Sequence, residues 1–220
     1  MASIESYIRP ATLYRYRSLR HFDREVAAIR NATLHCAPYS ALNDPMEGFY
    51  ISSKRLRESE NYKSIRALIA DNKAMLGICS FSEVHNNELM WAHYADQFRG
   101  ICVAYRFSGL LSNLGEDTEF IRLSYRENAP TVLSKKEPEY LAKRVLSCKN
   151  YRWLYEREWR MFAPKGTVTY ERVKSVQCVY LGSRIDADNS TKLKTIMRGL
   201  GIEVRTMSLD KYSMSFDTCR

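Results

Sequence analysis

The sequence predicts an α+β fold, a single domain over residues 1–220 in which helices cluster around a mixed or antiparallel split sheet. Three observations predict it. Strand-like and helix-like stretches both occur, several strands follow one another with no helix between them, and no Gly/Ser-rich linker or internal repeat divides the 220 residues. This order differs from the regular alternation of strand and helix in a doubly wound parallel sheet.

The individual elements follow from the spacing of apolar residues, which alternates in strands and recurs every three or four positions in helices. Strands are predicted at 12–16, 32–37, 75–81, 100–107, 119–125, 158–164, 176–182 and 202–209. Helices are predicted at 20–30, 53–72, 87–97, 138–150 and 186–199. The last of these elements give residues 176–209 a C-terminal strand–helix–strand.

Two connections show turn chemistry. The segment SALNDPMEGFY is predicted as a loop between strand 32–37 and the long polar helix. Its Asn-Asp-Pro favours an extended or turning backbone, and Gly48 closes the turn. The glycines of GLG, at 199–201, are predicted to end a helix.

The composition is that of an ordinary globular protein, with 45% hydrophobic and 27% charged residues. No apolar run approaches about 18 residues, so no membrane span is expected, and the N-terminus shows no export signal. None of the 6 cysteines forms a C-x-x-C pair, and four lie in apolar strand-like runs. Buried reduced thiols explain that placement better than disulfides or zinc, and we expect a cytoplasmic location.

The charge balance is strongly basic, with a formal net charge of +9. Such a field attracts polyanions and anionic cofactors without specifying which. Nucleic acid, nucleotide and an acidic protein partner all remain open. The sequence lacks a P-loop, a dinucleotide-binding fingerprint and a nucleophile elbow. Its 4 histidines have no His-x-x-x-His spacing, so no metal site is expected.

The first candidate stretch is TLYRYRSL, where strand alternation places Arg15 and Arg17 on one face, opposite Tyr14 and Tyr16. Two neighbouring arginines suit an anion or a pair of carboxylates. The alternative is a solvated edge strand, because arginine is mostly exposed.

The second stretch is CSFSEVHNNELMWAHYADQFRG. Ser82 follows a predicted strand, a usual position for functional side chains, and is a candidate cofactor ligand. His93 and Tyr94 need polar partners once buried, which favours a pocket, with Trp91 as support. A core helix with a structurally satisfied histidine is the alternative.

The third stretch is YRWLYEREWRMFAP, which places Glu156 and Glu158 on one strand face with Arg160. A glutamate surrounded by tryptophan and tyrosine is a candidate for a partly dry site, where its charge holds a sugar hydroxyl or a developing cation. The alternative is an intrastrand ion pair of little energetic value.

Taken together, the three stretches, SALNDPMEG and CSFSE resemble a bacterial family known as domain of unknown function 2971. The matching pieces occur in the same order and span residues 13–160. Their arrangement is similar to that of the ADP-ribosyltransferase superfamily, in which a split antiparallel sheet clamps NAD. The resemblance implies NAD as substrate, with Glu158 as the catalytic carboxylate. Cofactor contacts are implied for Arg15 or Arg17, for His93 and Tyr94, and for Glu156.

The leading hypothesis is an NAD-dependent ADP-ribosyltransferase, with a role in toxin or phage-defence biology, or its close variant, an NAD glycohydrolase. Its acceptor is a protein or a nucleic acid. The alternative is a non-catalytic nucleotide or nucleic-acid binding module. A metal-dependent nuclease is disfavoured because no Asp/Glu cluster stands at ligand spacing.

Overall fold

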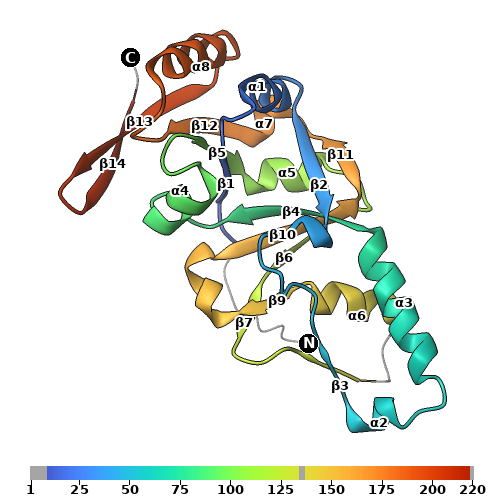
Figure 1. Cartoon of the computed structure of the whole chain (residues 1–220). Helices are drawn as coiled ribbons and strands as arrows, with labels where there is room; N and C mark the ends of the chain where they lie inside the picture. Colours follow the sequence, from blue (N-terminus) through green and yellow to red (C-terminus); the bar gives the residue numbers. More distant parts are fainter. Residues whose placement is uncertain (1–8, 134–136, 219–220) are drawn as a thin grey trace, which may run out of the picture. The chain divides into compact units, whose positions relative to one another are not determined.

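The computed structural model describes residues 9–133 and 137–218 (Figure 1). The chain divides into two units. The first contains the described residues of 1–32, 82–114 and 170–220, and the second contains those of 33–81 and 115–169. The single-domain organisation stays a prediction. Both units combine sheet and helix, so the predicted α+β class is confirmed.

The first unit is built on a mixed sheet. Its strands lie in the order β1 (Thr12–Arg17), β5 (Ile101–Arg106), β12 (Val176–Leu181), β13 (Glu203–Asp210) and β14 (Ser213–Thr218). Neighbouring strands are antiparallel except β12 and β13, which are parallel with Val179 opposite Val204. That parallel pair is joined by a helix, as a parallel connection requires. The predicted strand–helix–strand at 176–209 is therefore confirmed.

The first unit also contains helices. They are α1 (Phe22–Arg30), α4 (Glu88–Tyr94), α5 (Phe107–Asn113), α7 (Arg172–Ser175) and α8 (Ala187–Gly199). Asp186 caps α8 by accepting two backbone N–H groups, and Gly201, at φ +69°, follows its end as the GLG motif predicts. Helix α4 stops before the predicted residue 97, because residues 96–98 all have positive φ.

The second unit contains a sheet and two short parallel strand pairs. In the sheet, β11 (Gly166–Thr169) pairs with β2 (Thr33–Pro38), β2 with β4 (Leu76–Ser82), β4 with β10 (Glu158–Pro164), and β10 with β6 (Glu119–Arg122). The short pairs are β3 (Ile51–Ser52) with β8 (Thr131–Val132) and β7 (Ser124–Arg126) with β9 (Cys148–Asn150). The predicted strand 119–125 is split because its two halves pair with different strands.

Two predicted helices of this unit are shorter than expected. The structure has η1 (Tyr39–Ala41), α2 (Lys54–Arg57), α3 (Tyr62–Met75), α6 (Pro138–Val145) and η2 (Tyr151–Glu156). The predicted helix 53–72 breaks after α2, where the Ser59 hydroxyl donates to the Leu56 carbonyl at 2.7 Å. Serine competes with helical hydrogen bonding in this way, which favours helix ends. The predicted helix 138–150 ends early because residues 148–150 form a strand.

A compact apolar cluster fixes α2, α3 and α6 against β8. Its members are 0–1% exposed: Leu56, Ile69, Val132, Leu141 and Val145. Burial of such side chains contributes about 1.5–3 kcal/mol each. Four cysteines in strands, at 36, 79, 102 and 178, are buried as predicted. In the described ranges, none of the helices has the length and apolar character needed to cross a membrane.

Gly109 allows α5 to approach α7 closely, because a Cβ there would collide with the backbone carbonyl of Lys174. We expect Gly109→Ala to lower the free energy of unfolding by about 1–3 kcal/mol, as overpacking does. A Cβ at Gly115 would meet nothing within 4 Å. Gly115→Ala is the matched control and should change stability by less than about 0.5 kcal/mol. Equal urea midpoints for the two variants would contradict this contact.

Candidate functional site

The arginines of the first strand are held differently. Arg17 donates from Nε and Nη2 to both carboxylate oxygens of Glu25, at 2.7 and 2.8 Å. Glu25 is 4% exposed and also accepts from Arg24. Burial raises the pKa of Glu25, but the two guanidinium groups outweigh it and the net pKa is lowered. Arg17 thus joins β1 to α1, whereas Arg15 is half-buried opposite Val103.

The middle stretch divides into a buried and an exposed part. Trp91 is fully buried and donates its ring N–H to the His85 carbonyl at 2.7 Å. His93 is exposed and Tyr94 is half-buried, with ring centroids 6.3 Å apart in an edge-on arrangement. Ser82 is buried, and its hydroxyl accepts from the Val84 backbone N–H at 3.1 Å. The structure brings His93 and Tyr94 together, and their role in a cofactor site stays a prediction.

The third stretch forms a buried ion-pair network in the second unit. Arg160 is 0% exposed. Its guanidinium donates to both oxygens of Glu47, to Glu158 Oε1 at 2.9 Å and to the Leu146 carbonyl at 2.6 Å. Glu47 comes from the predicted SALNDPMEGFY loop, 113 residues away. One side chain therefore ties that loop to β10 and to the end of α6.

Lys149 is the second cation of this network. Its ammonium donates to Glu156, and to Glu158 Oε2 at 3.0 Å, and it lies 3.6 Å from Glu47. Arg157, at φ +46°, bends the backbone so that both flanking glutamates reach Lys149. Three carboxylates thus share two buried cations. Such an arrangement is stable only when hydrogen bonds satisfy every partner.

The electrostatics keep Glu158 ionised. Burial raises the pKa of Glu158, but Arg160 and Lys149 outweigh burial and hold that pKa well below its usual range. Burial also lowers the pKa of Lys149, and the charges of Glu158 and Glu156 reverse this, so its net pKa is raised. Both carboxylate oxygens of Glu158 are bonded inside the network. As it stands, the carboxylate is a structural anchor with a fixed negative charge.

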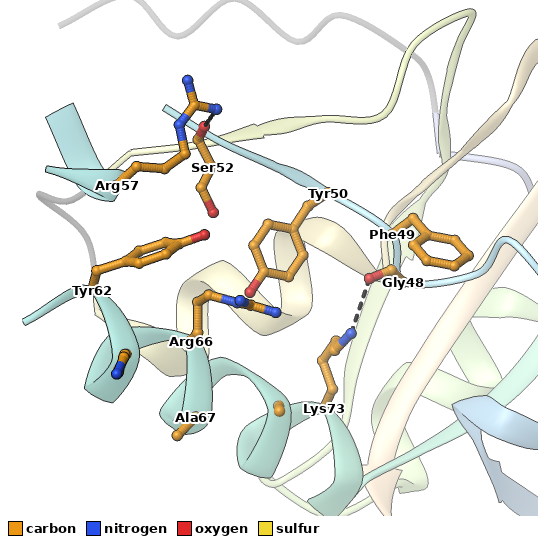
Figure 2. A pocket seen from close by; sticks show the side chains of 11 residues that line it. Gly48, Phe49, Tyr50, Ser52, Arg57, Tyr62, Arg66, Ala67 and Lys73 are labelled. Carbon is orange, nitrogen blue, oxygen red and sulfur yellow. Dashed lines mark hydrogen bonds between the residues drawn. The ribbon is translucent and has the colours of Figure 1, made fainter. Parts of the chain in front are cut away.

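A cavity of about 680 Å³ lies elsewhere in the second unit, and we call it the basic pocket (Figure 2). It is lined by Gly48, Phe49, Tyr50, Ser52, Arg57, Tyr62, Lys63, Arg66, Ala67, Ala70 and Lys73. Most of these residues lie on one face of α3, where positions three and four apart are neighbours. The two alanines leave room between the longer side chains. Among these lining residues four are cationic and none is acidic.

The cations of the basic pocket are positioned by carbonyls and aromatic rings. Lys73 donates to the Gly48 carbonyl at 2.9 Å, and its ammonium lies 5.7 Å from the Tyr50 ring centroid. The Arg66 guanidinium lies 5.6 Å over the Tyr62 ring. Such contacts orient a cation while leaving its charge in place. Burial lowers the pKa of Lys73, and an anion bound nearby would raise it again.

Sequence reasoning missed the basic pocket. The available signal was the spacing of Lys63, Arg66 and Lys73, which places three cations on one helical face. That spacing is equally typical of a solvated helix. Only the packing of α3 beside the segment 48–52 distinguishes a pocket from a solvated helix face, and that packing is a tertiary feature.

The fold and these sites define an α+β protein with a buried acid–base network and a cationic, aromatic cavity. Residues 90–161 match the model of a family described as protein of unknown function (DUF2971). The match supports the resemblance predicted from the sequence and includes Lys149, Glu156, Glu158 and Arg160. No curated protein and no solved structure matches the chain. The likeness to ADP-ribosyltransferases therefore stays a prediction.

The balance of three carboxylates and two cations in the network can be tested by two substitutions, one that removes a positive charge and one that removes a negative charge. Arg160→Met leaves three carboxylates beside one cation, and we expect it to lower the free energy of unfolding by about 3–5 kcal/mol. Glu158→Gln leaves two carboxylates beside two cations, and we expect a smaller loss. Urea unfolding of both variants at neutral pH measures the difference. An equal or larger loss in Glu158→Gln would contradict the network as described.

The loss of stability at low pH provides a second test of Glu158. Because the folded-state pKa of Glu158 lies below the ordinary value of 4.5, its stabilising contribution is complete above that pH. The contribution is lost as the pH falls toward the folded-state pKa. Wild-type protein should therefore lose more stability than Glu158→Gln when the pH is lowered below 4.5. If wild type and Glu158→Gln lost stability equally as the pH fell, Glu158 would not be the group whose lowered pKa stabilises the protein.

Proposed function

We propose that the protein binds nucleotides and that the ligand enters the basic pocket. The observation that carries this proposal is the composition of the pocket lining. It combines four cations with tyrosine rings, and no carboxylate stands among the residues that line it. Its volume of about 680 Å³ falls in the usual range of small-molecule sites, roughly 300–1,000 Å³.

The two kinds of side chain fit the two halves of a nucleotide. Arginine binds phosphate with paired, charge-assisted hydrogen bonds, and lysine binds it as a point charge. Tyr50 and Tyr62 offer rings against which a base can pack (Figure 2). A purely inorganic anion would use the cations but not the rings. The net charge of +9 would speed the approach of such a ligand.

Arg66 provides the sharpest test, because it lines the pocket and is exposed at the surface of α3. We expect Arg66→Ala to weaken binding of ADP at least tenfold, since a hydrogen bond to a charged group contributes about 1.5–3 kcal/mol. Calorimetric titration measures the affinity. Arg55→Ala removes the same charge from an exposed residue outside the lining and should leave the affinity within about twofold.

Two companion ligands and a salt series complete this test. Adenosine and inorganic pyrophosphate should each bind more weakly than ADP, because each lacks one half of the ligand. Higher salt should weaken ADP binding in wild type more than in Arg66→Ala, because the variant makes fewer phosphate contacts. Absence of ADP binding in folded protein, or equal affinity in the Arg66 and Arg55 variants, would refute the proposal.

A second candidate function is transfer or hydrolysis of ADP-ribose from NAD. What supports it is the ionised Glu158 within the family-matched segment, together with the resemblance described above. Cleavage of the nicotinamide–ribose bond requires a fixed negative charge beside developing positive charge. Since both oxygens of Glu158 are bonded to cations here, catalysis would require the network to open toward a ligand. A cytoplasmic location belongs to the same proposal.

If this second function holds, purified protein should release nicotinamide from NAD, and Glu158→Gln should abolish that release. Glu139→Gln is a matched control, because Glu139 is an exposed glutamate paired with Lys143 on α6. Chromatography measures the release, and thermal melting verifies that both variants are folded. Release at the wild-type rate from folded Glu158→Gln would exclude the catalytic assignment. ADP binding in the pocket would stand regardless of this result.

A further inference from the structure

A second cavity, of about 280 Å³, shares one lining residue with the basic pocket, and we call it the polar pocket. It is lined by Asp44, Met46, Glu47, Phe49, Arg126, Glu127, Asn128, Ala129, Pro130, Cys148, Lys149 and Asn150. Phe49 lines both cavities. The two cavities therefore meet at this one residue of the second unit.

The backbone on both sides of Phe49 is held in place. Glu47 is bound by the buried Arg160, and the Gly48 carbonyl accepts from Lys73. On the other side, the Ile51 N–H donates to the Pro130 carbonyl at 3.0 Å as β3 pairs with β8. Yet the Phe49 side chain is 64% exposed. An exposed aromatic ring on a fixed backbone offers a flat surface at little cost in conformational entropy.

The two cavities differ in chemistry. The basic pocket presents cations and tyrosines, which suit phosphate and a stacked base. The polar pocket is lined by the exposed carboxylate of Glu127, by the amides Asn128 and Asn150, and by one exposed cation, Arg126. The other two carboxylates of its lining, Asp44 and Glu47, are already bonded within the protein. Carboxylates and amides are the groups that pair with the amino and ring-nitrogen edges of bases. A ligand that repeats phosphate, sugar and base could use both.

We infer that the ligand of these cavities is a short single-stranded nucleic acid, which crosses Phe49 from one pocket to the other. This inference rests on the proposed nucleotide binding and extends it from one nucleotide to a strand. One nucleotide occupies the basic pocket, and a base of the next stacks on Phe49 or enters the polar pocket. Unpaired bases expose the edges that such a site reads, whereas a duplex hides them.

The test is the dependence of affinity on strand length. Calorimetric titrations compare 5′-AMP with 5′-phosphorylated di-, tri- and hexanucleotides of adenine, as RNA and as DNA. We expect the trinucleotide to bind at least tenfold more tightly than 5′-AMP, because each stacked base adds to the affinity. A difference between the RNA and DNA series would identify which strand is preferred. A duplex that contains the same trinucleotide should gain nothing over 5′-AMP.

Two variants locate the added affinity. Arg126→Ala should lower trinucleotide affinity at least fivefold and leave 5′-AMP affinity within about twofold, because Arg126 lines the polar pocket alone. Phe49→Ala should weaken the trinucleotide more than the mononucleotide. Arg55→Ala, outside both linings, should change neither. Both substituted side chains are exposed, so urea midpoints close to wild type are expected as the folding control.

The outcomes separate the two proposals. Equal affinities for 5′-AMP and trinucleotide, with 5′-AMP binding still lost in Arg66→Ala, would overturn the proposed binding of a nucleic-acid strand. The proposal of nucleotide binding would remain intact. An equal gain for the duplex, or a gain that survives both Arg126→Ala and Phe49→Ala, would also overturn it. Failure of every nucleotide to bind folded protein would refute both proposals.

Discussion

The second unit depends on one buried guanidinium. Arg160 donates hydrogen bonds to a loop, a strand and a helix end, because Glu47, Glu158 and Leu146 come from different elements. A guanidinium has five donors in a fixed plane, so it can bind one carboxylate through two parallel hydrogen bonds and still hold two further groups. Removal of one such partner leaves uncompensated charge in a dry interior, which is among the largest single penalties in a protein.

The ion-pair network around Arg160 fixes one wall of the basic pocket. Glu47 is the residue before Gly48, whose carbonyl receives Lys73 from α3. Fixing Glu47 therefore fixes the segment 48–50, which forms one wall of the pocket. The opposite wall, α3, is held by the apolar cluster that includes Ile69. Ionic contacts on one side and apolar burial on the other thus set the width of a cavity that neither element forms alone.

Much of the fold could be predicted from local sequence, and the sites could be predicted only in part. The strands at 12–16, 32–37 and 158–164 are confirmed because alternation is a local property. The helix predicted at 53–72 is broken because the Ser59 hydroxyl competes with its backbone. The Glu158–Arg160 pair and a partly dry site for the glutamate could be predicted from the sequence, but the complete burial of the pair could not. That burial depends on Glu47, whose partnership spans 113 residues and leaves no periodic trace.

The placement of acidic residues explains how a cationic cavity persists in this unit. The loop that forms its wall carries Asp44 and Glu47, and an acid beside the pocket would neutralise lysine and arginine there. Glu47 is instead turned inward to Arg160, and the Asp44 carboxylate accepts from the Met46 N–H at 2.9 Å. Both residues are buried, at 9% and 4% exposure, and both line the polar pocket. Neither acid therefore lines the basic pocket, and the four cations of that lining face an anionic ligand without a carboxylate among them.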